Sequence, residues 1–393
     1  MISVPDALQA MLTRISRAGT VRLPLAEALG RVLAQDACAD LDSPPFDASA
    51  MDGYALRRAD IAGSLRIVGE SAAGGAYSRH VGLGECVRIL TGAPVPIGAD
   101  CVVKQEDVVR EGDRVQVKRL DGPSFIRRRG ENRLQGEVLV RAGTRLGPPE
   151  LAALASAGIE QPEVVRAPRC VHLVTGNELV PPSQKPVGAQ IRDSNSTLVA
   201  ALLRKEAAQL VAQAHIIDHL AKAKAVVEAM PAYDVLFISG GASVGDHDIA
   251  RPLLTALGYT LHFQEVNLRP GRPLVFASRG SQLAFALPGN PVSHWVVFQL
   301  FVAPLLRQLE TGTPLAPVRL KGRLAAGGRL PPPDSRATYW PCVAAVVDGA
   351  YEVMLLTVAS SGDSSGLVGA NALLPMPGGK LEPGQSIEFI PCP

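Results

Sequence analysis

The sequence has no long hydrophobic run, no paired cysteine motif and almost no excess of charge, and each absence excludes a class of protein. No apolar stretch reaches the roughly 18 residues needed to cross a bilayer, and the longest candidate, 294–306, also contains Gln299. The six cysteines include no CxxC pair, which argues against a disulfide framework or a structural zinc site. A net charge of +2 excludes a nucleic-acid footprint spread over the whole chain and leaves only a local basic patch open.

Hydrophobic and turn-forming residues are abundant instead. Hydrophobic residues make up 47% of the 393, which excludes a disordered chain and allows a sizeable buried core. Glycine (38 residues) and proline (32 residues) exceed their average share without a collagen period, so we expect them in turns and loops. The length corresponds to roughly two to four domains. The N-terminal segment lacks the apolar core of a signal peptide, and the cysteine pattern favours a cytoplasmic protein with free thiols.

Hydrophobic periodicity predicts an α/β fold combined with β-rich parts. Between 51 and 140, short apolar runs separated by Gly, Pro and Asp predict a β-rich segment with tight turns. From 169 onward, strand and helix patterns alternate, which predicts a mainly parallel sheet covered by helices on both faces. The stretch 291–309 predicts one long helix. After 314 the pattern returns to short strands, enough for a small β-barrel or sandwich.

The strongest local signal is SGGASVGDHD (239–248), which follows a predicted buried strand and precedes a helix. Ligands of open α/β sheets bind at the carboxyl ends of strands. Paired glycines let backbone N–H groups approach a phosphate or another oxyanion closely, and a following helix N-terminus favours negative charge. The segment is neither a dinucleotide GxGxxG motif nor a P-loop. An ordinary turn between strand and helix is the alternative interpretation.

Two further turns are suited to contact with an anion. LPGNPVS (287–293) joins a strand to a helix, with Asn290 at the cap position and Pro291 at the first helical position. It is either a well-built helix start or a rigid wall for a ligand. RPGRP (269–273) holds Arg269 and Arg272 in a stiff turn between two strands, which suits an oxyanion, with a solvated hairpin as the alternative.

Three carboxylates are expected at one edge of the predicted sheet. Glu178 and Asp218 fall just after predicted strands, and Asp248 lies in the glycine-rich segment. Together they could hold a divalent cation such as Mg²⁺, which prefers oxygen ligands, although each alone is more often a helix cap or a loop charge. The run HIIDH (215–219) resembles a zinc-binding pattern, but a strand that ends at 217 would point its two histidines apart.

The β-rich segment contains turns whose composition alone does not make them functional. These are SAMDGYA (49–55) and RILTGAP (88–94). The segment FIRRRGEN (125–132) adds three successive arginines, which we interpret as a solvated charge run.

Taken together, these segments resemble the molybdopterin molybdenumtransferase family, the MoeA type that includes the C-terminal half of gephyrin. They occur in the family's order and cover nearly the whole chain, which makes chance agreement negligible. The matching segments are PPFDASAMDGYA (44–55), RILTGAPVPIGADCVV (88–103), RRRGEN (127–132), VTGNELV (174–180), DSN (193–195), SGGASVGDHD (239–248), RPGRP (269–273) and LPGNPVS (287–293).

The resemblance implies four domains and a homodimer. The resemblance places the substrate cleft of this homodimer between the α/β domain of one subunit and the inserted domain of the other. The implied domains are a three-layer α/β molybdopterin-binding domain (1–20 plus 165–315), an elongated linker domain (21–44 plus 141–164), an inserted β-rich domain (45–140) and a C-terminal β-barrel (316–393).

The resemblance also implies a reaction of molybdenum cofactor biosynthesis. Molybdate would be inserted into adenylylated molybdopterin with release of AMP, and Mg²⁺ held by Asp218 and Asp248 would assist. The positions that match catalytic residues of the family are Asp52, Thr91, Glu178, Asp218 and Asp248. The implied binding residues are Ser239, Gly240, Gly241, Ser243, Gly245, Pro288, Gly289, Asn290 and Pro291 for the pterin phosphate, with Arg269 and Arg272 for molybdate.

Several positions depart from the family's pattern, and some of them cluster around the expected oxyanion site. They bear on the affinity for molybdate and on the choice between molybdenum and tungsten. The departures are Asn132, Asn177, Glu265, Pro341 and Gly366. Two other functions stay open: a molybdopterin adenylyltransferase, whose family shares the α/β fold, and a non-catalytic dimeric scaffold that binds the cofactor, as the parallel with gephyrin allows.

Overall fold

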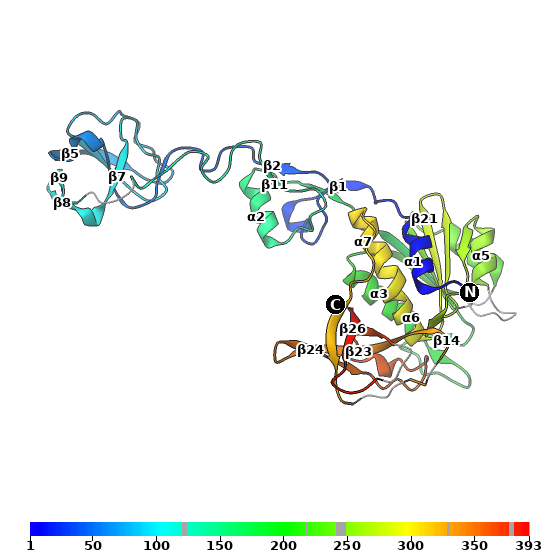
Figure 1. Ribbon diagram of the computed structural model, residues 1–393. Helices are drawn as coiled ribbons and strands as arrows, with labels where there is room; N and C mark the ends of the chain where they lie inside the picture. The colour runs from blue at the N-terminus through cyan, green and yellow to red at the C-terminus, as the bar shows by residue number, and fades with distance from the viewer. Residues whose placement is uncertain are drawn as a thin grey trace. The chain divides into compact units, whose positions relative to one another are not determined.

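The computed structural model describes residues 1–119, 124–216, 219–240, 249–327, 331–332, 334–376 and 381–392. The chain forms two compact units (Figure 1). The main unit comprises Met1–Val21 and Val165–Pro393, and the inserted unit comprises Arg22–Val164. The short strands β1 (Thr20–Arg22) and β12 (Glu163–Val165) contain the two points at which the chain passes between the units. The division into four domains stays a prediction.

A six-stranded sheet forms the centre of the main unit. The three pairings among its first four strands are parallel, whereas the last two pairings are antiparallel because β20 runs opposite to both of its neighbours. In sheet order the strands are β16 (Gln209–Ile216), β13 (Arg169–Thr175), β17 (Val235–Ser239), β21 (Gln282–Leu287), β20 (Val275–Arg279) and β18 (Thr260–Phe263). The predicted, mainly parallel sheet is therefore confirmed, with an antiparallel edge.

Helices cover both faces of this sheet, as the alternating pattern predicts. Within β17, Phe237 packs into the core on one face, whereas Leu236 and Ile238 pack into the core on the other. The first face is covered by α1 (Val4–Leu12), α3 (Asn195–Lys205), α6 (Pro291–Val297) and α7 (Ala303–Thr311), and the second by α4 (Leu220–Glu228) and α5 (Ala250–Ala256).

The predicted single helix over 291–309 is wrong in detail, because a π-helical segment, Phe298–Val302, separates α6 from α7. Pro304 lies in the first turn of α7. Its ring nitrogen carries no hydrogen, so the regular hydrogen bond to the preceding turn is lost there. The wider π-helical turn accommodates the proline, so α6, the π-helical segment and α7 follow one another without a break.

A five-stranded barrel follows the α/β part of the main unit, which confirms the predicted β-barrel. Its strands close a ring because β23 pairs with both β24 and β25. Trp340 and Phe389 are among the side chains that fill its core. The strands are β22 (Leu320–Leu324), β23 (Ala337–Val347), β24 (Ala350–Leu355), β25 (Ala372–Pro375) and β26 (Ser386–Pro391), and β19 (Leu268–Arg269) adds to the edge of β23.

The inserted unit contains a curled six-stranded sheet, as the β-rich pattern predicts. The strands pack so closely at Gly53 that a Cβ atom there would be 1.9 Å from the Val103 carbonyl oxygen. In sheet order the strands are β7 (Cys101–Lys104), β4 (Gly53–Leu56), β6 (Glu85–Ile89), β5 (Ser64–Ser71), β9 (Arg114–Val117) and β8 (Val108–Glu111).

The rest of the inserted unit has a hydrophobic cluster of its own, which includes Leu33, Val140 and Leu154. Helix α2 (Pro148–Ser156) begins where the sequence predicts, with a proline in its first turn and the Glu150 carboxylate accepting from the Gly147 N–H at 2.9 Å. Two small strand pairs complete this unit: β2 (Ala37–Cys38) with β11 (Val138–Val140), and β3 (Ala48–Ser49) with β10 (Ile126–Arg127).

Among the described residues, no helix combines the length and hydrophobicity that a membrane crossing requires.

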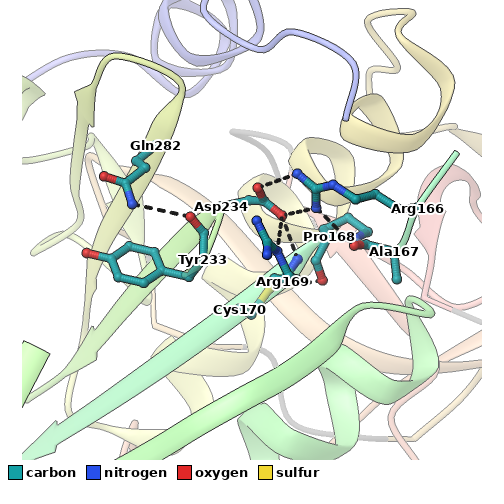
Figure 2. Close-up of polar contacts among 8 residues, drawn as sticks. All are labelled: Arg166, Ala167, Pro168, Arg169, Cys170, Tyr233, Asp234 and Gln282. Carbon is teal, nitrogen blue, oxygen red and sulfur yellow. Dashed lines mark hydrogen bonds and ion pairs between the residues drawn. The ribbon is translucent and has the colours of Figure 1, made fainter. Parts of the chain in front are cut away.

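An ion-pair cluster joins the amino ends of three neighbouring strands in the main unit (Figure 2). The Arg166 guanidinium donates two hydrogen bonds to the Asp234 carboxylate, at 2.6 and 2.7 Å, and the Arg169 backbone N–H donates a third at 2.8 Å. The Asp234 carbonyl oxygen accepts from the Leu283 N–H at 2.9 Å. The Arg166 backbone N–H donates to the Gly19 carbonyl at 2.9 Å. This bond joins the segment that precedes the inserted unit to the segment that follows it.

These contacts also set the ionisation of Asp234. Burial by itself would raise the pKa of the Asp234 carboxyl, but the hydrogen bonds from Arg166 and Arg169 and the charges of both arginines outweigh burial, so the pKa is lowered. A carboxyl whose pKa is lower in the folded state stabilises the fold above its ordinary pKa. That contribution is lost as the pH falls through the lowered value.

We expect Asp234→Asn to lower the free energy of unfolding by roughly 1–3 kcal/mol at neutral pH, because a charged acceptor of three hydrogen bonds is lost. The difference from the wild type should persist above about pH 5 and begin to shrink below about pH 4, since the Asp234 carboxyl of the unfolded chain is protonated there, whereas that of the folded chain is protonated only at lower pH. Urea denaturation at several pH values measures it. Glu228→Gln, which breaks the exposed pair with Lys224, is the matched control and should change little. Equal stability of Asp234→Asn and wild type would contradict the role of the cluster.

Candidate functional site

The carboxyl ends of β13, β17 and β21 lie side by side at one edge of the main sheet. Register places Val174 opposite Ser239, and Ser239 opposite Leu287. The loops that follow these strands therefore start next to one another. We call Thr175, Asn195, Ser239, Gly240 and Gly289 the strand-end cradle.

The backbone of Gly240 packs directly on Thr175. A Cβ atom at Gly240 would be 2.4 Å from the Thr175 carbonyl oxygen, and Gly240 has a φ of +88°, which favours glycine. A Cβ atom at Gly289 would be 3.8 Å from the Gly240 Cα atom, so the second loop passes close by. At Gly240 and Gly289, the cradle therefore consists of backbone atoms without side chains.

Asn195, the last residue of the DSN segment, fastens the second loop. Its Nδ2 donates to the Gly289 carbonyl oxygen at 2.6 Å. Among the described residues, its buried Oδ1 has no hydrogen-bond partner, and the same is true of the buried Thr175 Oγ1. Buried polar groups without partners cost free energy unless a water or a ligand satisfies them. Within the described ranges, the cradle thus contains one hydroxyl and one amide oxygen whose hydrogen bonds are unmade.

The loop 288–291 differs in one respect from the sequence prediction. Pro291 occupies the first turn of α6 as expected, and Asn290 precedes it, but the Asn290 side chain makes no capping bond. Its Nδ2 instead donates to Ser361 Oγ at 2.8 Å, because the barrel loop lies within reach. The Ser361 carbonyl accepts from the Val292 N–H at 3.0 Å, so this contact replaces the cap.

His294, which sequence reasoning missed, is completely buried below this loop. Its Nδ1 lies 3.2 Å from the Pro288 carbonyl oxygen, and because a carbonyl only accepts, Nδ1 carries the proton. Its Nε2 is therefore an acceptor, and no described residue donates to it. Burial lowers the pKa of His294 to about 4, against the opposing effects of the Pro288 bond and of the Asp193 charge. The ring is neutral at physiological pH.

The carboxylates predicted for a metal site are only partly described. Glu178 is exposed and follows β13. The other predicted positions Gly241, Ser243, Gly245, Asp218 and Asp248 lie outside the described residues. Within the described ranges, no group of three or more His, Cys, Asp or Glu side chains is arranged to hold a metal.

The two histidines of the zinc-like run lie on different elements. His215 is on β16, where its Nε2 lies 2.9 Å from the Gly176 carbonyl oxygen. His219 precedes α4, where its Nδ1 accepts from the Lys222 N–H at 3.3 Å. Each ring is thus committed to backbone, and the arrangement differs from the continuous helix that the zinc pattern requires.

Both arginines of the RPGRP turn are paired with carboxylates. Arg269 Nη1 donates to the Pro332 carbonyl oxygen at 2.5 Å and lies 3.5 Å from Asp334. Arg272 pairs with Glu265 at 3.1 Å. Hydrogen bonds from Arg336, together with the charges of Arg336 and Arg269, hold the pKa of Asp334 far below its ordinary range. An oxyanion at this turn would therefore compete with two carboxylates, Asp334 and Glu265, for the arginines.

In the inserted unit, strand pairing brings Asp52 and Thr91 together. Gly53 pairs with Ile89, so the residue before β4 meets the turn after β6. Asp52 Oδ1 accepts from the Thr91 N–H at 2.7 Å and from Thr91 Oγ1 at 2.8 Å. These two bonds, the backbone one first, lower the pKa of Asp52, and the charge of Arg88 adds to them. Asp52 is therefore a fixed, ionised carboxylate.

The three successive arginines are exposed, as expected of a solvated charge run, and they are also paired. Each is paired with a carboxylate that lies close in space: Arg127 with Glu131 at 2.7 Å, Arg128 with Asp47 at 2.6 Å and Arg129 with Asp42 at 2.6 Å. Two of these carboxylates are more than 80 residues away in the sequence. Asn132, one of the departures, accepts from Arg127 Nη2 at 2.6 Å. The arginines therefore hold the segment to the strand region before it.

Comparison with known proteins extends over almost the whole chain. The family model "MoeA N-terminal region (domain I and II)" matches residues 2–158, and the model "Probable molybdopterin binding domain" matches residues 172–308. The second match contains the strand-end cradle, and the first contains Asp52 and Thr91.

Relatives and solved structures agree with these matches. A molybdopterin molybdenumtransferase of Nostoc sp. is 34% identical over 96% of this chain and 90% of its own length, and one of Haemophilus influenzae is 35% identical over 79% and 78%. A crystal structure of a molybdopterin biosynthesis MoeA protein from Pyrococcus horikoshii is 26% identical, covers 100% of this chain and 99% of its own, and superposes with a TM-score of 0.85. The chain therefore belongs to the molybdopterin molybdenumtransferase family.

Proposed function

We propose that this protein completes the molybdenum cofactor by inserting molybdenum from molybdate into adenylylated molybdopterin, with release of AMP. Membership of an enzyme family of molybdenum cofactor biosynthesis supports the transferase activity. The strand-end cradle is the single observation that carries the assignment of the substrate.

The cradle offers groups of two kinds to a ligand. Thr175 Oγ1 has a proton to donate, and the backbone at Gly240 and Gly289 is bare enough for close approach, which suits a phosphate. Asn195 Oδ1 only accepts, so it matches an N–H donor. A pterin with a phosphate group carries both an anion and ring N–H donors, and this combination fits the cradle better than a simple inorganic anion does.

Mg²⁺ is part of the proposal as a cofactor. Glu178 is an exposed carboxylate at the correct edge of the sheet, and an all-oxygen set of Glu178, Asp218 and Asp248 has the donor chemistry that Mg²⁺ prefers. We assign Asp218 and Asp248 as its ligands by sequence match. When bound, the ion would supply charge neutralisation for the pyrophosphate group.

Asp52 and Thr91 are proposed to act on the substrate from the inserted unit. Because Thr91 holds one oxygen of the Asp52 carboxylate with two hydrogen bonds, the other oxygen keeps a fixed direction. Orientation of this kind is what a positioned catalytic carboxylate needs. We also propose that the protein is a cytoplasmic homodimer, as the resemblance implies.

A non-catalytic scaffold that binds molybdopterin is the second candidate. The pairing of Arg269 with Asp334 and of Arg272 with Glu265 favours it, because these contacts reduce the net positive charge available to molybdate. Such a protein would bind molybdopterin at the cradle without turnover.

The full-length purified protein should release AMP from adenylylated molybdopterin when Mg²⁺ and molybdate are present. Chromatographic quantification of AMP measures the reaction, and a parallel reaction with tungstate measures metal preference. Binding of molybdopterin without AMP release would favour the scaffold. Consumption of ATP with unmodified molybdopterin would instead identify an adenylyltransferase.

Thr91→Val should lower the rate of AMP release by roughly tenfold, because one of the two bonds that orient Asp52 is lost while the backbone bond remains. Loss of this donor should also raise the pKa of Asp52 toward its ordinary value. If ionisation of Asp52 limits the rate of AMP release at low pH, that fall in rate should then occur at a higher pH than in the wild type. Thr144→Val, at a half-buried threonine of the same unit, is the control. Unchanged turnover of Thr91→Val would remove Thr91 from the mechanism.

Gly240→Ala should abolish molybdopterin binding, since its Cβ atom would collide with the Thr175 carbonyl and displace the cradle. Gly280→Ala is a matched control, because Gly280 also has a positive φ, of +58°, but has no atom within 4 Å of the added Cβ. The control should lose only about 1 kcal/mol of stability and bind normally. Isothermal titration with molybdopterin and thermal unfolding separate the two effects, and normal binding by Gly240→Ala would contradict the assignment of the cradle.

A further inference from the structure

Ser239, the last residue of β17, is hydrogen-bonded to a histidine beneath the cradle. Ser239 Oγ lies 2.7 Å from His172 Nε2, and Gln213 Nε2 lies 2.8 Å from His172 Nδ1. His172 is on β13 and Gln213 is on β16, so three neighbouring strands contribute to this chain of polar groups. Ser239 is 1% exposed and His172 is 0% exposed. Sequence reasoning did not single out either His172 or Gln213.

The Ser196 carbonyl oxygen fixes the direction of every hydrogen bond in this chain. It lies 3.1 Å from the same Gln213 nitrogen, and because a carbonyl only accepts, the atom facing it must be the amide N–H₂ group. The second proton of that group points to His172 Nδ1, which must therefore accept. The proton of the neutral imidazole is then on Nε2, and Nε2 donates to Ser239 Oγ.

The reverse orientation is excluded by the same carbonyl. If Ser239 donated to His172, then Nδ1 would carry the proton and would require the Gln213 amide oxygen opposite it. That oxygen would then lie 3.1 Å from the Ser196 carbonyl oxygen, so two acceptors would face each other with no proton between them. Burial, together with the nearby His294, lowers the pKa of His172 to about 3, so the ring stays neutral and carries one proton only.

We propose that His172 is a positioning residue, which occupies the acceptor side of the Ser239 hydroxyl and thereby directs the Ser239 proton toward the phosphate of the bound pterin. The inference rests on the proposed function, and it assigns to Ser239 the role of a hydrogen-bond donor whose direction is set in advance. In the described part of the chain, the Ser239 hydroxyl donates to no other group. Preorganised donors of this kind bind anions without reorganising when the ligand arrives.

The test is a double-mutant cycle on the full-length protein, with molybdopterin and phosphatase-treated molybdopterin as the two probes. Ser239→Ala should weaken binding of molybdopterin by roughly tenfold or more, as expected for a hydrogen bond to a charged group. His172→Leu should weaken it by about threefold to tenfold, because the hydroxyl remains but is no longer directed. The double variant should bind no more weakly than Ser239→Ala alone.

Two comparisons distinguish positioning from a merely structural role. Binding of the dephosphorylated probe should be unchanged in all three variants, because the contact is made to the phosphate. His262→Leu is the matched control: it breaks a histidine–serine bond of the same 2.7 Å, to Ser278, between strands at the antiparallel edge of the sheet. The control should leave the affinity for both probes unchanged.

Nitrogen-15 NMR of the wild-type imidazoles tests the orientation even if His172→Leu fails to fold. A proton on His172 Nε2 supports the proposal, and a proton on Nδ1 overturns it. Equal losses for both probes, additive effects of the two substitutions, or unchanged binding by His172→Leu would overturn it as well. Failure of the wild type to bind molybdopterin would overturn the proposed function and the inference together, whereas binding with an additive cycle would overturn the inference alone.

Discussion

The close packing of Gly240 on Thr175 is the contact on which the candidate site depends. It holds the ends of β13 and β17 so near each other that no side chain fits between them. The loop from β21 approaches the same point and is fastened there by Asn195. Since the parallel register sets all three strand ends at one level, the cradle is a product of sheet geometry rather than of a single loop.

The two ends of the main sheet differ in whether their polar groups have hydrogen-bond partners. At the amino ends, Asp234 receives hydrogen bonds from Arg166 and from Arg169, and its own backbone groups are paired across the strands. At the carboxyl ends, Thr175 and Asn195 each keep a buried polar atom that has no partner in the described part of the chain. One end thus contributes stability while the other retains unsatisfied groups, as is common where a protein binds a ligand.

The sequence predicts the parts of this structure that depend on local pattern or on ordered motifs. Strand and helix alternation, the barrel, the helix starting at Pro148 and the location of Ser239 and Gly240 at a strand end were all predictable. Contacts between segments far apart in the sequence were not. The ion pairs of Arg128 and Arg129, the contact of Asn290 with Ser361 and the burial of His172 depend on which chains become neighbours after folding. No periodicity reports such neighbours, because a buried histidine and an apolar residue occupy the same position in a strand pattern.

The hydrogen bond between the Arg166 N–H and the Gly19 carbonyl has a consequence for the topology of the chain. The backbone leaves the main unit just after Gly19 and returns just before Arg166, so the two ends of the excursion are already adjacent. Closing a loop between adjacent points costs little entropy even when the loop contains more than a hundred residues, since the cost rises only with the logarithm of its length. In evolutionary terms, the inserted unit is therefore a module that can be gained, lost or exchanged at this position without breaking the connectivity of the sheet that carries the cradle.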